Sequence, residues 1–201
     1  MKLVGSKTSP YVRKVRVILA ERALKFDFVE ESAWNAGTTV PRYNPLNKVP
    51  ALVLDDGSSI YDSAVITEYL DAISGGHFIP SEPVARAKAR TFESLGDGIA
   101  DAGITFFLER KREATRQDPG WMKRQMDKVD AGIVALSEAL GKGPFLGGGQ
   151  PNVGDIACAC ALFWVEFRMP EIPWRDENAN LKAWAERMES RPSFASTKPQ
   201  A

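Results

Sequence analysis

The sequence has little of what marks a disulfide scaffold or a metal site. It holds two cysteines and one histidine among 201 residues. Two cysteines are too few for a disulfide framework, which favours a reducing compartment. Cys158 and Cys160 stand two positions apart in an apolar run, where helical side chains point in different directions. We therefore expect small buried side chains there, no metal site, and a surface position for His77.

Long hydrophobic segments and an excess of charge are also missing. No run approaches the roughly 18 apolar residues of a membrane span, and the N-terminus reaches Lys7 before a secretory signal could form. Lys and Arg number 26 and Asp and Glu number 26, so the formal net charge at pH 7 is zero. A protein that neutralises many phosphates needs a cationic surplus. We expect a cytoplasmic protein with a small soluble ligand, no nucleic acid and no membrane partner.

The first part of the chain alternates strand-like and helix-like segments. Strands are expected at residues 3–5, 26–29, 49–54 and 59–61. Helices are expected after Ser9-Pro10 and after Asp62-Ser63, because apolar residues recur there at intervals of three and four. The order is therefore β-α-β, a long loop, and then β-β-α.

The rest of the chain has helical patterns only. Residues 80–83, Pro-Ser-Glu-Pro, form a linker, and residues 122–140 carry an apolar stripe of helical period. Residues 156–165 are apolar almost all round, which predicts the central buried helix. We expect two domains, residues 1–77 and residues 84–201, the second of them all-helical.

A short basic run stands in the middle of the helical part. Arg110, Lys111 and Arg112 are flanked by Glu109 and Glu113. Charges of both signs at this spacing indicate a solvated helix face before they indicate a binding patch.

Ser9 is the first residue that could carry chemistry. It precedes Pro10, a favoured first residue of a helix, so its hydroxyl stands where unpaired N–H groups and the helix dipole favour an anion. One interpretation is an N-cap, which is a sufficient explanation by itself. The other is a hydroxyl that donates a hydrogen bond to a bound thiolate. The basic residues before the first acid, Glu21, are Lys2, Lys7, Arg13, Lys14 and Arg16.

Two further segments have both a structural and a functional interpretation. Pro50 could be an ordinary residue at the start of a strand, or the Val49-Pro50 bond could be cis, as in about 5–6% of X–Pro bonds in folded proteins. A cis bond would leave the Val49 N–H and C=O groups pointing outward for a peptide-like ligand. Asp62-Ser63 could be a helix cap, or a second helix N-terminus that takes a carboxylate.

In these segments the sequence resembles the cytosolic glutathione S-transferases, in particular small bacterial members with a serine at the active-site position. The resemblance rests on Ser9-Pro10-Tyr11-Val12-Arg13-Lys14-Val15, on Asn44-Pro45-Leu46-Asn47-Lys48-Val49-Pro50-Ala51-Leu52, and on Asp62-Ser63 leading into Ile66-Thr67-Glu68-Tyr69-Leu70. The segment 152–155, read as a capping box, matches the C-terminal helical domain of that family. The resemblance covers essentially the whole chain. It implies a thioredoxin-like N-terminal β-α-β-β-α domain followed by a C-terminal helical bundle, usually as a homodimer with glutathione as cosubstrate.

Carried over by position, the resemblance also implies roles for individual residues. Ser9 would hydrogen-bond the glutathione sulfur. The remaining glutathione-binding residues would be Lys48 at the glycyl carboxylate, Val49 and Pro50 at the cysteinyl backbone, and Asp62 and Ser63 at the γ-glutamyl end. A pocket for an apolar electrophile needs a few large side chains near the sulfur. The candidates are Tyr11, Phe106, Phe107 and Trp164, with plain core packing as the alternative, above all for Trp164.

Three functions are compatible with these residues. The first is a glutathione transferase that activates the thiolate for attack on a small, largely apolar electrophile, in a detoxification role. The second is a glutathione-dependent isomerase or dehalogenase on the same scaffold. The third is a non-catalytic interaction module that has lost glutathione binding. Retention of the whole set of implied glutathione contacts argues against the third, because an idle site has no physical need for them.

Overall fold

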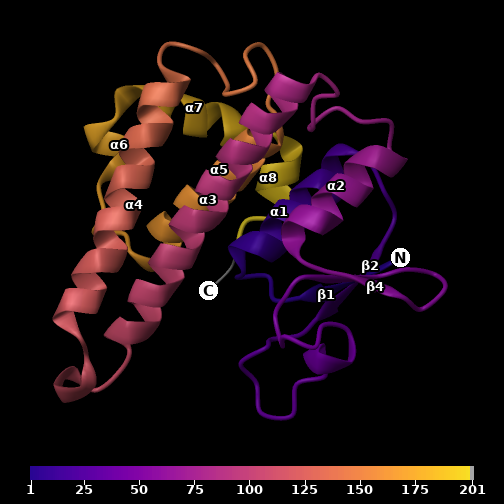
Figure 1. The fold of residues 1–201 in the computed structure, drawn as a ribbon, viewed down its shortest axis with the longest axis horizontal. Coiled ribbons are helices and arrows are strands. Elements are labelled where there is room, and N and C mark those ends of the chain that lie inside the picture. The colour runs from indigo at the N-terminus through magenta and orange to yellow at the C-terminus, as the bar shows by residue number, and fades with distance from the viewer. Residues whose placement is uncertain (200–201) are drawn as a thin grey trace. The chain divides into compact units, whose positions relative to one another are not determined.

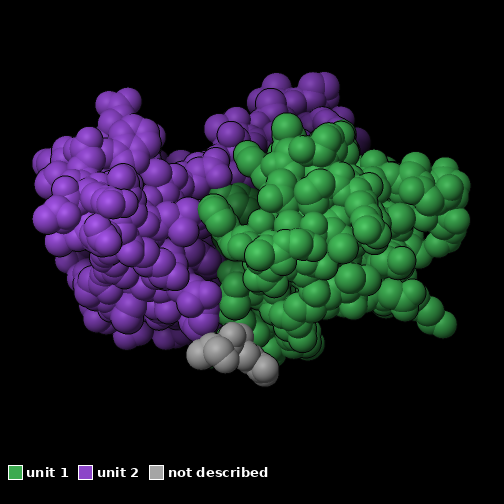
Figure 2. All heavy atoms as spheres, turned by 90° about the horizontal axis from the view of Figure 1, so that it is seen from below, with its two compact units in different colours: residues 1–79, 190–201 green, residues 80–189 purple. Residues whose placement is uncertain are grey.

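A computed structural model describes residues 1–199 of the chain and divides it into two compact units (Figure 1, Figure 2). Unit 1 comprises residues 1–79 together with the C-terminal segment that begins at Ser190, and unit 2 comprises residues 80–189. The β-α-β-β-α order followed by a helical part agrees with the predicted fold class. The predicted division places the C-terminal segment in the second domain. In the structure this segment belongs to unit 1, because it packs on the first helix of that unit.

Unit 1 is built on a four-stranded sheet with the strand order β2-β1-β3-β4. The strands are β1 (Lys2–Gly5), β2 (Asp27–Glu30), β3 (Ala51–Val53) and β4 (Ser59–Ile60). Strand β1 pairs in parallel with β2 and antiparallel with β3, and β3 pairs antiparallel with β4. The parallel pair requires a crossover connection, which the first helix supplies.

Helices α1 (Pro10–Glu21) and α2 (Ser63–Ile73) lie side by side in unit 1 (Figure 1). The valines, the isoleucine and the leucine of α1 and, on α2, Ile66 and Leu70 are buried, as are the central residues of β1 and β3, whereas Val65 and Ile73 on α2 are exposed. A 3-10 helix, η1 (Val40–Arg42), interrupts the long loop before β3, and α8 (Pro192–Ser196) packs on α1. This core holds the N-terminal ends of α1 and α2 in fixed positions.

Unit 2 is a bundle around α5 (Val153–Arg168), whose residues 153–165 are all buried, which confirms the predicted central helix. The other helices are α3 (Pro83–Arg110), α4 (Pro119–Leu140), α6 (Trp174–Glu177) and α7 (Ala179–Glu189), with a 3-10 helix, η2 (Ala114–Arg116), before α4. Helix α3 can pack closely on α5 at Gly96 because glycine has no Cβ. A Cβ at this position would lie 2.6 Å from the backbone of Ala157. Cys158 and Cys160 are buried and unbridged.

A capping box begins α5, as the sequence predicts. The Asn152 side chain accepts hydrogen bonds from the N–H groups of Gly154 and Asp155, and the Asp155 carboxylate accepts one from the N–H of Asn152 at 3.0 Å. Asp155 also accepts from the indole N–H of Trp184 on α7 at 2.9 Å. One buried carboxylate thus joins two helices of unit 2. No helix within residues 1–199 is long and apolar enough to cross a membrane.

Candidate glutathione site

Ser9 caps helix α1, and its hydroxyl keeps a hydrogen to donate. Its backbone is extended, and its Oγ accepts a hydrogen bond from the N–H of Val12 at 3.3 Å. The Ser9 N–H donates to the carbonyl of Ser6 at 3.1 Å, which fixes the turn between β1 and the helix. Pro10 follows as the first helical residue. Because the cap uses a lone pair of Oγ, the O–H hydrogen remains available to an anion in front of the helix.

The second predicted segment, Val49-Pro50, has a cis peptide bond. Pro50 is buried and leads directly into β3. Of the two interpretations that the sequence allows, the cis bond is therefore the one present. Lys48, just before it, is exposed.

Asp62 caps helix α2 and is exposed, whereas Ser63, the first helical residue, is buried with 4% of its surface exposed. The Asp62 Oδ1 accepts hydrogen bonds from the N–H groups of Ala64 at 2.9 Å and Val65 at 3.4 Å. The Tyr61-Asp62 peptide bond is also cis. Both helix caps that the sequence indicates in unit 1 are thus confirmed.

The sheet register places these three segments at one end of the sheet. Val4 near the end of β1 pairs with Ala51 at the start of β3, so the turn to Ser9 and the Val49-Pro50 bond leave the sheet at the same end. Ile60 at the end of β4 pairs with Leu52, so Asp62 follows at that end too. Residues far apart in the sequence therefore form one surface of unit 1, with two helix N-termini on it.

The positive field that the sequence predicts around Ser9 is weaker in the structure. Lys7 forms an ion pair with Glu30 on β2, at 2.7 Å. Arg13 is buried and donates to the carbonyl of Phe194 on α8, at 3.2 Å. Arg16 lies over the ring of Phe28, and its pKa is lowered by burial and by the charge of Arg13. Lys7 and Arg13 are thus engaged with other groups, and the N-terminus of α1 adds its own positive potential at Ser9.

Asn44 lies in this region, and the sequence motifs gave no prediction of its role. It is buried, its Nδ2 donates to the carbonyl of Lys48 at 2.9 Å, and its Oδ1 accepts from the N–H of Leu46 at 3.0 Å. These bonds close the loop that ends at the cis bond. The sequence does contain a signal for this turn. An Asn side chain readily accepts a hydrogen bond from the backbone N–H two residues later, and this bond forms an Asx turn.

The four aromatic pocket candidates are divided between the units. Tyr11 is half-buried on α1 in unit 1. Phe106 and Phe107, at the end of α3 in unit 2, are also half-buried, whereas Trp164 on α5 has only 6% of its surface exposed. Trp164 meets Phe107 edge to face, with ring centroids 5.8 Å apart. That burial fits a packing role for Trp164. Within residues 1–199, no group of His, Cys, Asp and Glu is placed to hold a metal ion.

Comparison with known families identifies the class of protein to which this fold and site belong. Residues 8–73 match the family model described as glutathione S-transferase, N-terminal domain, and residues 119–187 match that of the glutathione S-transferase C-terminal domain. The chain belongs to the glutathione S-transferase family, as its sequence motifs suggest.

Individual members of the family match along the whole chain. The chain is 37% identical over 200 residues to YibF of Escherichia coli K12, an uncharacterized GST-like protein, covering 99% of this chain and 98% of YibF. It is similar to a glutathione S-transferase from Methylobacterium radiotolerans in complex with glutathione sulfonate, with a TM-score of 0.95 and 38% identity over 100% of this chain and 95% of that one. A glutathione S-transferase from Methylobacillus flagellatus with bound glutathione gives a TM-score of 0.96 and 36% identity over 99% of both chains.

Proposed function

We propose that the protein is a glutathione transferase that uses Ser9 to stabilise the thiolate of glutathione for attack on a small, largely apolar electrophile. The observation that carries the proposal is the Ser9 hydroxyl at the N-terminus of α1, with its oxygen used by the Val12 N–H and its hydrogen available. Relatives at 36% and 38% identity hold glutathione and glutathione sulfonate. A sulfonate is an anion at the position of the thiol group, although its negative charge lies on three oxygens and not on the sulfur.

The free energy required is within reach of this arrangement. Lowering a thiol pKa from about 8.5 to roughly 6.5 needs about 2.7 kcal/mol of preferential thiolate stabilisation. One hydrogen bond to a charged group contributes about 1.5–3 kcal/mol, and a helix N-terminus adds roughly 0.3–1 kcal/mol. Ser9 on α1 can therefore activate the thiol without a general base. The glutathione proton leaves to solvent. The thiolate then forms the new C–S bond as the electrophile's bond to its leaving group breaks, and the leaving group departs with the bonding electron pair.

The other predicted contacts extend the same proposal. The exposed Lys48 would meet the glycyl carboxylate, and the outward backbone of Val49 beside the cis Pro50 would pair with the cysteinyl residue. Asp62 and Ser63, at the N-terminus of α2, would hold the γ-glutamyl end. A tripeptide with separated charges suits two helix N-termini at one end of a sheet. Within unit 1, the half-buried Tyr11 on α1 is the proposed contact of the electrophile.

Replacing Ser9 tests the proposal. Ser9→Ala and Ser9→Gly both remove the hydroxyl, but glycine keeps most of the capping free energy, so the pair separates chemistry from helix stability. We expect the pKa of bound glutathione, followed by thiolate absorbance, to rise by about 1–2 units in both variants. The catalytic efficiency kcat/KM at neutral pH should fall accordingly.

Thr8→Ala is the matched control, because Thr8 is a hydroxyl residue of the same turn that contacts Ser6 at 3.0 Å. It should leave the bound thiol's pKa where it is in the wild type. An unchanged thiol pKa in both Ser9 variants would show that Ser9 is only a cap. Absence of any calorimetric glutathione binding at millimolar concentration would refute the transferase itself.

We also infer a homodimer and a detoxification role from the family. Sedimentation equilibrium tests the dimer, and a monomer at micromolar concentration would contradict it.

A further inference from the structure

Glu31 is a half-buried acidic residue at the end of the sheet that carries the candidate glutathione site. It follows the last residue of β2, and its N–H donates to the carbonyl of Gly5, the last residue of β1, at 3.1 Å. Gly5 pairs with Glu30 in a parallel register, so Glu31 leaves the sheet at the same end as the turn to Ser9. An acidic side chain here acts against the binding of an anionic tripeptide. Its presence therefore needs a reason other than contact with the ligand.

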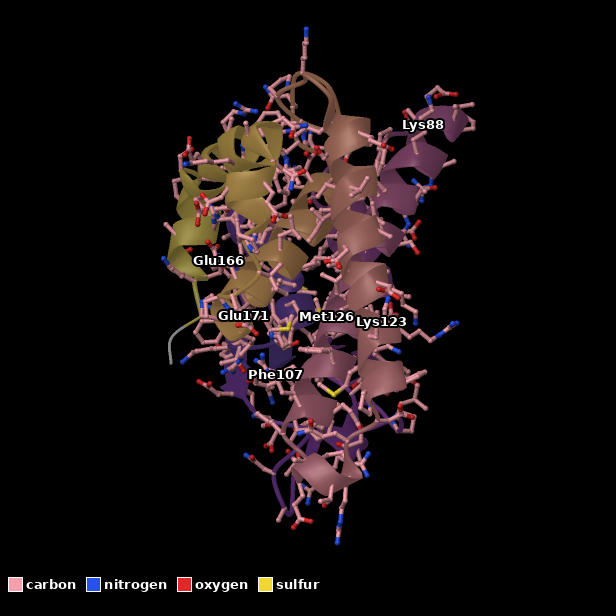
Figure 3. All side chains as sticks on the ribbon, turned by 90° about the vertical axis from the view of Figure 1, so that its left-hand side faces the viewer. Lys88, Phe107, Lys123, Met126, Glu166 and Glu171 are labelled. Carbon is pink, nitrogen blue, oxygen red and sulfur yellow. The ribbon has the colours of Figure 1, made fainter. Side chains whose placement is uncertain are left out.

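The partners of the Glu31 carboxylate are hydroxyl groups and not cations. Its Oε1 accepts a hydrogen bond from the Thr38 hydroxyl at 2.9 Å, and its Oε2 accepts one from the Thr39 hydroxyl at 3.1 Å. Among residues 1–199, no cation lies within ion-pair distance of it. By contrast, Glu166 of unit 2, labelled in Figure 3, pairs with the guanidinium of Arg175 at 2.8 Å. The two oxygens of Glu31 thus hold two neighbouring residues of the long loop before β3.

A first connection from Glu31 to Lys48 runs through the 3-10 helix η1. The two threonines directly precede η1, which begins at the buried Val40. The Val40 carbonyl accepts a hydrogen bond from the N–H of Asn44 at 2.9 Å, and the Asn44 side chain donates to the carbonyl of Lys48 at 2.9 Å. Glu31 therefore fixes the start of a segment whose other end is the backbone of Lys48.

A second connection runs through the loop of residues 32–37. Glu31 closes this loop, because it bonds to threonines seven and eight positions later in the sequence. Within the loop, the Ala33 carbonyl accepts a hydrogen bond from the side-chain amide of Asn47 at 3.1 Å. Asn47 directly precedes Lys48. Two separate hydrogen-bonded connections from one carboxylate thus reach the same short stretch of backbone.

We propose that Glu31 is a positioning residue of the glutathione site, which places Lys48 for the glycyl carboxylate by way of the two threonine hydroxyls. The inference rests on the proposed function, because that function assigns Lys48 to the glycyl carboxylate. Glu31 itself does not touch glutathione. It holds the backbone on which Lys48 stands, so that less conformational freedom is lost when the tripeptide binds.

Calorimetric titration with glutathione tests the inference through the Kd. Glu31→Ala removes both acceptors and should weaken glutathione binding about fivefold or more. Glu31→Gln keeps the shape and one acceptor oxygen, so it should retain most of the affinity. The double variant Thr38→Val/Thr39→Val removes both hydroxyls but leaves the acid in place, and it should lose as much affinity as Glu31→Ala. An unchanged Kd in the valine variant would overturn the inference.

A role through Lys48 also predicts two results that a general loss of stability does not. In a Lys48→Ala background, Glu31→Ala should weaken binding less than about twofold, because the two changes act on the same contact. In an otherwise wild-type chain, Glu31→Ala should raise the KM for glutathione but keep kcat within about twofold, because Ser9 is untouched. Equal losses of affinity from Glu31→Ala in both backgrounds would overturn the inference.

Asp56→Ala is the matched control. Asp56 also accepts a hydrogen bond from a hydroxyl, that of Ser58 at 2.6 Å, but in the turn between β3 and β4. That turn lies at the other end of the sheet, where Val53 at the end of β3 pairs with Lys2. A Kd of Glu31→Ala equal to that of Asp56→Ala would refute the positioning role alone. Absence of glutathione binding by the wild type would refute the transferase, and the positioning role with it.

Discussion

Glu21 holds the C-terminal segment of unit 1 to helix α1, and Glu21→Gln measures how much that attachment stabilises the unit. Its carboxylate accepts hydrogen bonds from Arg191 Nε at 2.8 Å and Nη2 at 2.7 Å, and from the Ser193 hydroxyl at 2.5 Å. The side chains of Glu21 and Arg191 are 15% and 27% exposed. Glutamine keeps the shape and one acceptor oxygen but removes the charge.

Hydrogen bonds to a charged group contribute about 1.5–3 kcal/mol when well formed. Solvent reaches part of this pair, and glutamine retains some of the bonding, so we expect a loss of about 1–2 kcal/mol in the free energy of unfolding. That corresponds to a fall of roughly 2–8 °C in melting temperature for a chain of this size. The assay is urea unfolding at neutral pH.

The dependence on pH provides the sharper test. Burial acts to raise the pKa of Glu21, but hydrogen bonds from Arg191 and Ser193 and the charge of Arg191 bring it below its ordinary value of 4.5. A carboxyl with a lowered pKa in the folded state stabilises the protein above its unfolded pKa, and this contribution is lost as the pH falls through the folded pKa. The wild-type advantage over Glu21→Gln should be largest near pH 7 and shrink below about pH 4.5.

The control for Glu21 is Glu30→Gln. Glu30 pairs with Lys7 at a similar distance, 2.7 Å, but the two side chains are 54% and 50% exposed. Exposed pairs contribute about 0.2–1 kcal/mol, so this change should cost less. Equal costs for the two variants, or an advantage over Glu21→Gln that grows toward acid pH, would refute the reasoning.

Three other substitutions probe packing, the loop before β3, and the buried carboxylate. Gly96→Ala should cost about 1–3 kcal/mol in thermal unfolding, because its Cβ would lie 2.6 Å from the α5 backbone. Gly98→Ala, with open space around its Cβ, should stabilise the protein by up to about 1 kcal/mol. Equal effects of the two substitutions would contradict the packing argument. Asn44→Ala should raise the KM for glutathione more than it lowers kcat, because the loop loses its side-chain bonds; an unchanged KM would show that the loop needs no such support. Trp184→Phe should cost about 1–3 kcal/mol in urea unfolding, since Asp155 loses a donor, and an unfolding midpoint equal to the wild type would argue against that bond.

Features that depend on a few consecutive residues could be predicted from the sequence. The caps Ser9 and Asp62 and the box at residues 152–155 each join a side chain to N–H groups two or three positions away. Their residue types at that spacing are therefore a sufficient signal. The buried helix at residues 156–165 was predictable for a similar reason, because its apolar residues leave it no exposed face.

Features that depend on long-range contacts could not be predicted in this way. The C-terminal segment joins unit 1 through Arg191 and Glu21, which are 170 positions apart in the sequence. Nothing in the local pattern near Arg191 indicates that partner. The charge around Ser9 is a second example, because Lys7 is neutralised by Glu30 on a neighbouring strand. A run of cations in a sequence therefore gives an upper limit for the local field.

The three basic residues at positions 110–112 are adjacent in the sequence but have different partners in the structure. Arg112 pairs with Glu109 at 2.8 Å, as a solvated helix face predicts, and Arg110 pairs with Glu171 beyond the end of α5. Lys111 points to the Phe107 ring instead, where Arg168 also lies. Both arginines of the run therefore have a carboxylate partner, whereas the described contact of the lysine is with an aromatic ring. Because ion pairs form one by one, a net charge of zero for the whole chain does not require that every cation has a carboxylate partner.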